Sequence, residues 1–313
     1  MKEFGGYFEL QIPQNNTDLF KEQLAVNFGR AGLEIIVKKR GYKTVLLPDY
    51  ICPVVNETLN KLNVHIVTYA INSKLEPTIS TNNFDDDVGF LYVNYFGVKG
   101  KFSRKIITEC KNLILDLTQA FYFKDDNKCD FFNSTRKFFG VPDGGFVSFR
   151  DGVDLDIDLE QSYSWDKCEH LLKRLDIGAN EGYQSFIQHD SNMDMWSPKK
   201  MSKLTSSLLC SIDIDYCAKI RKDNFNFLHD ELNGYNELAL DIDEDIPMVY
   251  PLMLNDASKL RANLIKNNIF CAKYWPNITT NEQFEDKIIP LPIDQRYTCV
   301  DMEYIVSVLK KII

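Results

Sequence analysis

The chain has 313 residues, of which 44% are hydrophobic and 26% are charged, proportions that are ordinary for a globular protein. A chain of this length usually exceeds one hydrophobic core, so two packed lobes are expected. Its 36 basic and 45 acidic residues give a net charge of -9, which argues against nucleic acid or an anionic membrane surface as the main partner.

The first half of the chain alternates short apolar runs with helical patterns. Helical periodicity predicts helices at 15–40, 54–62 and 102–111. Apolar runs predict strands at 43–47, 64–69, 88–94, 113–116, 129–133 and 145–149. This alternation favours an α/β fold with a mostly parallel central sheet flanked by helices. The run at 88–93 is apolar throughout, which is typical of a strand buried on both faces.

The second half changes character, because helical patterns dominate from 164 to 232. The longest predicted helix spans 200–232. A strand at 248–254, a helix at 257–268, a strand near 270–274 and a helix at 300–312 follow it. We therefore expect a large domain at 1–200 and a small C-terminal α+β domain at 201–313, which includes the long connecting helix.

The cysteines and the N-terminus indicate a cytoplasmic protein. The N-terminal sequence lacks the apolar segment of a signal peptide, and no apolar stretch is long enough to cross a bilayer. The eight cysteines include no C-x-x-C pair, and the four histidines are dispersed. Reduced thiols, no metal site and no membrane partner are expected.

Ligands of open α/β sheets bind beyond the carboxyl ends of the strands. The residues that directly follow the predicted strands are therefore the candidates for a site. They include an acid, amides, a hydroxyl group, aromatic rings and a lysine, at 48–50, Asn94, Tyr95, Asp116, Gln119 and 134–137.

Asp116 ends an apolar strand, where a carboxylate must find a partner or suffer desolvation. One interpretation is a helix N-cap. The other is the partner of a cationic ring nitrogen.

Lys137 lies between a predicted strand and a turn rich in glycine and proline. A solvated surface cation is the simple interpretation. However, Phe138 and Phe139 follow it, and a lysine drawn into an apolar site becomes a nucleophile. Gly144 and Gly145 allow close backbone approach. Chemistry with pyridoxal 5'-phosphate (PLP) requires such an amine, a carboxylate at the ring nitrogen and donors for the phosphate.

Several segments, in order along the chain, resemble the sugar aminotransferases of the DegT/StrS type, which have the aspartate-aminotransferase fold, PLP fold type I. Similar segments lie at 28–34, 45–50, 93–97, 116–120, 134–145, 200–202 and 289–293. In particular, Asp-Leu-Thr-Gln-Ala at 116–120 resembles the family's Asp-x-x-Gln-Ala element. A Gly-Gly pair seven and eight residues after Lys137 also matches the family.

The resemblance implies that Lys137 holds PLP as a Schiff base and that Asp116 pairs with the pyridine nitrogen. Gln119 would then bond the ring oxygen. The remaining implied cofactor contacts are Gly29, Arg30, Ala31 and Ser134 at the phosphate, and Tyr50 or Tyr95 on the ring. Cys52 falls near the position of the family's stacking aromatic residue. Pro198 replaces an asparagine that reaches the neighbouring subunit, and Lys199 or Lys200 would substitute for it.

The implied activity is transfer of an amino group, with glutamate as the expected donor, to a keto group of a nucleotide-linked sugar for surface polysaccharide synthesis. The enzyme would be a homodimer, with Tyr183, Lys200 and Arg296 as candidate substrate residues. Two alternatives stay open: a PLP-dependent transaminase of another small keto compound, and a non-catalytic binding or regulatory protein of the same fold. The sequence names neither the sugar nor the carbon that receives the amine.

Overall fold

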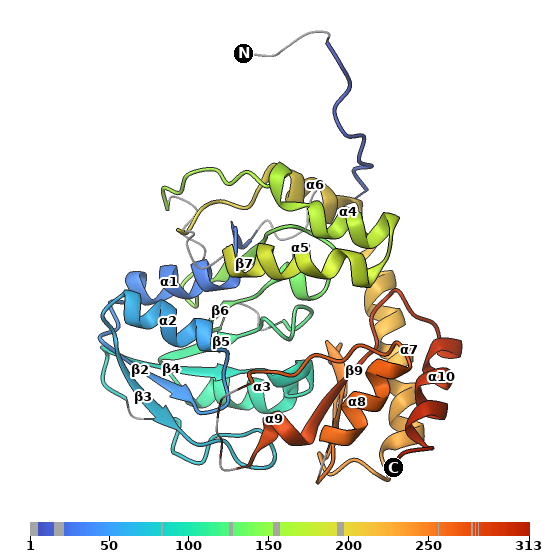
Figure 1. Cartoon of the computed structure of the whole chain (residues 1–313). Coiled ribbons are helices and arrows are strands. Elements are labelled where there is room, and N and C mark those ends of the chain that lie inside the picture. The colour runs from blue at the N-terminus through green and yellow to red at the C-terminus, as the bar shows by residue number, and fades with distance from the viewer. Residues whose placement is uncertain are drawn as a thin grey trace.

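A single sheet organises the N-terminal part of the computed structural model. The structure describes residues 6–15, 22–82, 84–124, 128–152, 157–192, 197–255, 257–276, 278, 280 and 282–313. Within them, the strands of the sheet are β1 (Leu24–Val26), β2 (Thr44–Pro48), β3 (His65–Tyr69), β4 (Val88–Val93), β5 (Leu113–Asp116), β6 (Asp130–Phe132) and β7 (Gly145–Ser148). Their order is β1-β7-β6-β5-β4-β2-β3 (Figure 1).

The predicted parallel sheet is confirmed. Strands β3, β2, β4, β5 and β6 pair in parallel, whereas β7 runs antiparallel to both β6 and β1. In the central strand β4, the side chains from 89 to 93 are buried. This burial explains its continuous apolar sequence, because helices or loops cover both faces of the strand.

Three helices connect strands of this sheet: α1 (Gly29–Arg40), α2 (Pro53–Lys61) and α3 (Gly100–Glu109). Helix α1 packs on β6 and β7 and lies beside α2. Gly32 permits this packing, because a Cβ atom there would lie 2.8 Å from both Phe132 Cβ and Val147 Cγ2.

The predicted helix at 15–40 is wrong in its first part. Residues 16–21 lie outside the described part of the chain, and Leu24–Val26 form strand β1. Helix α1 begins only at Gly29, after Phe28 with extended backbone angles. The pairing of β1 with β7 overrides the helical pattern, since it buries Leu24 and Val26 in the core.

The predicted helix at 200–232 consists of two helices, α6 (Lys203–Ser211) and α7 (Ile214–Leu232). The hydroxyl group of Ser202 accepts from the amide of Thr205 and caps α6. Asp213 caps α7 by accepting from the amide of Tyr216. The short polar side chain of Asp213 favours an N-cap over a helix interior, which explains the break.

The segment before α6 contributes η3 (Trp165–Lys167), α4 (Glu169–Asp176) and α5 (Ala179–Asn192). The last two helices form a hairpin that lies above the sheet in Figure 1. The C-terminal part contains β8 (Val249–Met253), α8 (Ser258–Lys266), α9 (Phe284–Lys287), β9 (Ile288–Pro292) and α10 (Cys299–Leu309).

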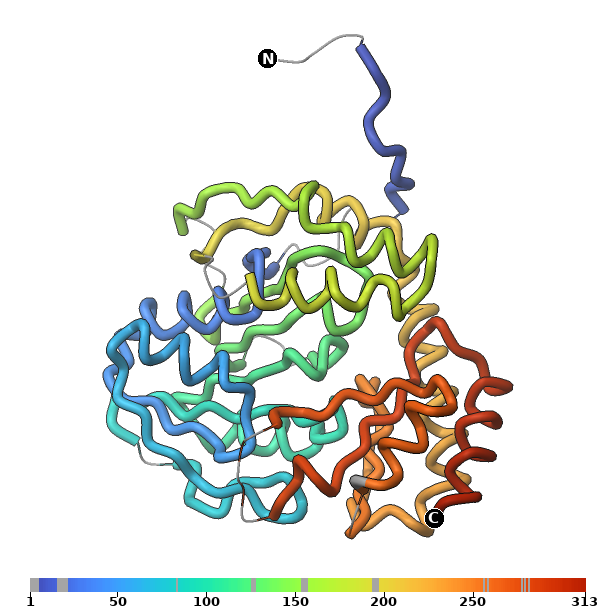
Figure 2. Tube along the Cα trace, viewed as in Figure 1, coloured from blue at the N-terminus to red at the C-terminus, as the bar shows by residue number. Residues whose placement is uncertain are grey.

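The tube in Figure 2 shows the C-terminal part packed beside the sheet lobe. Strands β8 and β9 pair antiparallel, and α7 packs on both β8 and α10. The predicted strand near 270–274 is wrong, because no strand is assigned to these described residues. The division into domains at residue 200 stays a prediction.

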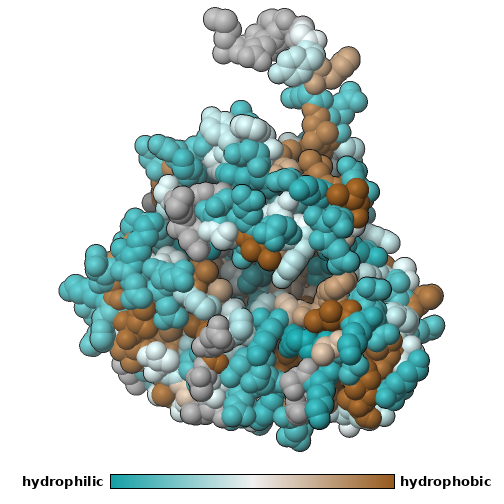
Figure 3. Space-filling view, in the orientation of Figure 1, coloured by the Kyte–Doolittle hydropathy of each residue, from teal (hydrophilic) through white to brown (hydrophobic). Residues whose placement is uncertain are grey.

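Residues 6–15 extend away from the body (Figure 3). Tyr7, Phe8 and Leu10 on this segment are exposed. Its base is fixed where the amide of Asn15 donates to the carbonyl of Cys210. Across the described part of the chain, no helix combines the length and apolar character needed to cross a membrane.

A buried carboxylate fixes the entry to α6. Both oxygens of Asp143 are bonded: they accept from the Ser202 amide and hydroxyl group, at 3.2 and 2.8 Å, and from the hydroxyl groups of Thr205 and Ser162. Asp143 is fully buried. It therefore ties the turn after Lys137 to the start of α6.

Replacing this carboxylate is expected to destabilise the fold. Asp143→Ala should lower the free energy of unfolding in urea by about 3 kcal/mol, because several buried donors lose a charged acceptor. Asp241 is the matched control, since its carboxylate is exposed and pairs with exposed Lys101. Asp241→Ala should cost less than about 1 kcal/mol. Equal losses in the two variants would contradict this role of Asp143.

Candidate active site

Three adjacent parallel strands end at the same edge of the sheet. Val93 of β4 pairs with Asp116 of β5, and Asp116 pairs with Phe132 of β6. The first turn of α1 meets the same edge. A Cβ atom on Gly29 would lie 3.0 Å from the carbonyl oxygen of Asn133. The structure thus brings together four predicted site segments that are far apart in sequence.

Hydrogen bonds through Thr118 link the two predicted catalytic residues. The Lys137 ammonium group donates to Thr118 Oγ1 at 3.0 Å, and the hydroxyl group of Thr118 bonds the carboxylate of Asp116. The amide of Thr118 also donates to Asp116 Oδ1, at 2.8 Å. Thr118 therefore lies between the amine and the acid.

The environments of the amine and the acid differ sharply. Asp116 is buried, whereas Lys137, in the turn η2 (Thr135–Lys137), is exposed. The expectation that Lys137 lies in an apolar site is therefore wrong. Phe138 and Phe139 turn away from it into a separate buried cluster with Phe121. The amine thus lies at the open side of the site.

Burial raises the pKa of the Asp116 carboxyl group. The positive charge of Lys137 and the two hydrogen bonds from Thr118 oppose this shift. A carboxylate in such a position is stabilised by a further cation, because desolvation disfavours its charged form. Asp116 is therefore suited to pair with a positively charged group of a ligand.

The amide of Gln119 has a defined orientation. Its Oε1 accepts from the backbone amide of Phe96 at 2.7 Å, so Nε2 is the donor end. Gln119 is fully buried, yet Nε2 has no hydrogen-bond partner among the described residues. Asn94 Nδ2, after β4, also lacks a partner within those residues. Buried donors are normally satisfied, so these atoms indicate a missing acceptor.

The start of α1 is a suitable position for an anion. The helix has no acidic residue in its first turn, and its N-cap residue Phe28 makes no side-chain cap. The amides of Gly29, Arg30 and Ala31 belong to this first turn, where helix N-termini favour negative charge. Ser134 lies in the adjacent segment and is buried.

Arg136 adds a cation to this region that the sequence analysis did not identify. Burial lowers its pKa, an effect that Asp190 opposes and the charge of Arg30 reinforces. Its guanidinium group lies 3.4 Å from the Asp190 carboxylate in α5. Two arginines that repel one another beside a helix N-terminus increase the positive potential there.

Cys52 faces the same group of charges. Burial raises the pKa of its thiol, whereas the positive charges of Lys137 and Arg30 lower it and Asp116 raises it. Cys52 is the N-cap residue of α2, after β2. It therefore lies close enough to Lys137, Asp116 and Arg30 for their charges to act on it.

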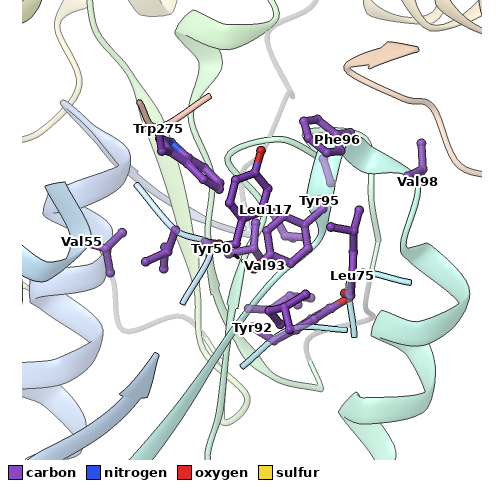
Figure 4. Close-up of a cluster of buried hydrophobic side chains, with 14 of the residues drawn as sticks. Tyr50, Val55, Leu75, Tyr92, Val93, Tyr95, Phe96, Val98, Leu117 and Trp275 are labelled. Atoms are coloured by element: carbon purple, nitrogen blue, oxygen red, sulfur yellow. Dashed lines mark hydrogen bonds between the residues drawn. The ribbon is translucent and has the colours of Figure 1, made fainter. Parts of the chain in front are cut away.

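Tyr50 and Tyr95 occupy a buried aromatic cluster (Figure 4). Their rings stack with centroids 5.6 Å apart, and the hydroxyl group of Tyr95 donates to the carbonyl of Tyr50. Trp275 packs its edge against Tyr50, with 4.6 Å between centroids. The proposed ring contact of Tyr50 or Tyr95 stays a prediction, and both residues link the sheet to the C-terminal part.

The three candidate substrate residues are dispersed over the surface. Tyr183 is exposed on α5, and Lys200 is exposed beside Val26. The Arg296 side chain is 54% exposed and makes a bidentate pair with Asp294, at 2.6 and 2.8 Å. A role of these residues in substrate binding stays a prediction.

The sequence analysis assigned no role to Thr118. A hydroxyl residue two positions after a buried strand-end aspartate can form such local bonds, and this pattern was the available signal. No comparable local signal identifies Arg136. Within the described residues, no group of three or more histidine, cysteine or acidic side chains is placed to hold a metal ion.

No protein-family model matches the sequence, and no curated protein matches it. Solved structures match along almost the whole chain. The sugar aminotransferase CalS13 of Micromonospora echinospora matches with a TM-score of 0.65 at 17% identity, over 93% of this chain and 88% of its own. The protein NtdA of Bacillus subtilis, with bound cofactor PMP, has a TM-score of 0.66 at 14% identity, over 92% and 72%.

A DegT/DnrJ/EryC1/StrS aminotransferase of Brucella abortus matches with a TM-score of 0.59 at 13% identity, over 92% of this chain and 85% of its own. The chain has the fold of these aminotransferases. The predicted fold class, PLP fold type I, is thereby confirmed.

The raised pKa of Asp116 predicts that the folding stability of the ligand-free protein depends on pH. The folded state binds this proton more tightly than the unfolded state, so stability falls as pH rises from about 4 through the raised pKa. Asp116→Asn removes the charge while keeping an acceptor for Thr118. We expect its melting temperature to exceed that of the wild type at pH 7, and the difference to shrink toward pH 4. A variant less stable than the wild type at pH 7 would contradict this.

Proposed function

We propose that this protein is a PLP-dependent aminotransferase. The observation that carries the proposal is the Lys137–Thr118–Asp116 chain beside the unpartnered donor of Gln119. These residues fit the cofactor. The amine matches its aldehyde and the buried acid matches its ring nitrogen, while the amide donor matches the ring oxygen and the helix start matches the phosphate. When bound, PLP supplies an electron sink that makes the α-proton of an amino acid removable.

Each residue has a defined task in this proposal. Asp116 would hold the proton on the ring nitrogen, because its buried carboxylate favours a cationic partner. Gln119 Nε2 would donate to the ring oxygen. The first-turn amides of α1, with Arg30 and Ser134, would bind the phosphate.

Lys137 performs the proton transfer. Its Nζ would hold the cofactor covalently. Once an amino-acid donor has freed it, the same amine would accept the α-proton of that donor. Thr118 Oγ1 orients this amine, since Lys137 already donates to it.

The matched structures support a proposal for the substrate class, because one is described as a sugar aminotransferase and another as a DegT/DnrJ/EryC1/StrS aminotransferase. We propose a keto group on a nucleotide-linked sugar as amino acceptor, glutamate as donor and surface polysaccharide synthesis as the context. Because Lys137 is exposed, a bulky acceptor can reach its amine. A cytoplasmic homodimer, with domains at 1–200 and 201–313, completes the proposal.

A second candidate is transamination of another small keto compound. Cys52 supports it, because it falls near the position of the stacking aromatic residue in the resembled family and would change the surface that a substrate meets. Keto-sugar nucleotides and simple keto acids, supplied separately with glutamate, distinguish the two by which accepts the amine. No turnover with either class would support a non-catalytic binding protein.

The central prediction concerns covalent capture of the cofactor. Wild-type protein incubated with PLP and reduced with borohydride should carry one added pyridoxyl phosphate group on Lys137, detected by peptide mass spectrometry. Lys137→Ala should lose this adduct and lower the transamination rate at least about a thousandfold, because the nucleophile and proton carrier are the same group.

Lys219→Ala is the control, since the exposed side chain of Lys219 pairs with Asp223 within α7. It should keep the adduct on Lys137. Adduct formation on several lysines, or none on Lys137 in the wild type, would overturn the proposed function. Loss of visible cofactor absorbance when glutamate is added to the wild type would support transamination over simple binding.

A further inference from the structure

A strained turn follows β4 and contacts the predicted cofactor residue Gln119. In this turn, η1 (Tyr95–Gly97), Phe96 has a φ of 58° and a ψ of 5°, which is the left-handed region. A bulky side chain rarely adopts it unless surrounding contacts impose it. The amide of Phe96 donates to Gln119 Oε1 at 2.7 Å. Its carbonyl accepts from the amide of Met248 at 2.8 Å.

The next link is a buried arginine in α7. Arg221 is 1% exposed, and its Nη1 donates to the carbonyl of Met248 at 2.9 Å. Its Nη2 donates to the carbonyl of Phe138 at 3.2 Å. The guanidinium group also lies 4.8 Å from the centroid of the Phe138 ring. Phe138 is the residue directly after Lys137.

A second donor reaches the same peptide from the C-terminal part. Gln295 Nε2 donates to the carbonyl of Phe138 at 2.8 Å. On its other side, the lysine turn is held within the sheet lobe, because the amides of Phe138 and Phe139 donate to the carbonyl of Thr135. The backbone at Phe138, directly after Lys137, is therefore held by hydrogen bonds from both parts of the molecule.

These bonds form one continuous series from Gln119 through Phe96, Met248 and Arg221 to Phe138. We propose that Arg221 is a positioning residue that sets the lysine turn and the Gln119 amide in fixed relation to one another. The inference rests on the proposed function, since it assigns the series the task of aligning Lys137 Nζ with the ring that Gln119 orients.

The chemistry of Arg221 supports a positioning role over simple packing. Burial lowers the pKa of its guanidinium group, and the carboxylate of Asp294 opposes the shift. The group nevertheless donates two hydrogen bonds to carbonyls that are 27 and 83 residues away in the sequence. A planar guanidinium group spans both acceptors in fixed geometry, whereas a lysine ammonium group is a single point donor. Arg221→Lys therefore keeps the charge but breaks the series.

Arg261 provides a matched control. Its guanidinium group also donates to backbone carbonyls, those of Cys271, Ala272 and Ile288, but all three lie in the C-terminal part. Arg261→Lys thus makes the same chemical change without touching the lysine turn. Gln295→Leu is a second test variant, because it removes the other donor to Phe138 without leaving a buried charge.

The first measurement is amide hydrogen exchange of residues 135–141 in the cofactor-free protein. Exchange there should rise about tenfold in Arg221→Lys and in Gln295→Leu, as expected when a charged or buried hydrogen bond to the turn is lost. It should stay at the wild-type rate in Arg261→Lys. A wild-type rate in both test variants, or an equal rise in the control, would overturn the inference.

The second measurement is a pH titration of the visible absorbance of protein loaded with PLP. Displacement of Lys137 should change the pKa of the nitrogen that joins it to PLP. The midpoint of the titration in Arg221→Lys should therefore shift by about half a pH unit or more from that of the wild type. The midpoint of Arg261→Lys should not move. An unchanged midpoint in Arg221→Lys would overturn the positioning role. If wild-type protein takes no PLP on Lys137, the proposed function fails, while the exchange measurement still decides whether Arg221 fixes the turn.

Discussion

The buried carboxylate of Asp116 is the constraint on which the site depends. It stands at the end of β5 between two other parallel strands, so water cannot solvate it and its charge must be compensated locally. Thr118 and Lys137 supply part of this compensation and are thereby drawn to the same edge. The close approach of α1 at Gly29, where a Cβ atom would lie 3.1 Å from Thr118 Cγ2, brings a helix N-terminus beside Thr118.

The sheet could be predicted from the sequence because its strands carry local signals. The apolar run of β4 and the strand-turn-helix order at 43–69 required no long-range information. The failures lie where tertiary contacts decide. Strand β1 has a helical pattern but pairs with β7, and one polar cap at Asp213 divides a long helical pattern into two helices.

The site shows the same division between local and long-range information. The gathering of Asp116, Gln119 and Lys137 could be predicted because each lies at or just after the end of a strand, and parallel strands end together. Arg221 could not, since its importance comes from two carbonyls distant in sequence. Lys137 does not lie in an apolar site for a geometric reason: in the turn η2 its side chain is exposed and donates to Thr118, whereas the next two rings are buried in a separate cluster.

Lys137 is exposed whereas Asp116 is buried, so the site has an open side at the amine and a closed side at the acid. Tyr50, Tyr95 and Trp275 pack against one another in a buried aromatic cluster. Those rings join the sheet lobe to the C-terminal part, as do Arg221 and Gln295 at the lysine turn. Contacts between the two parts therefore hold the lysine turn in place, while the side chain of Lys137 itself stays exposed.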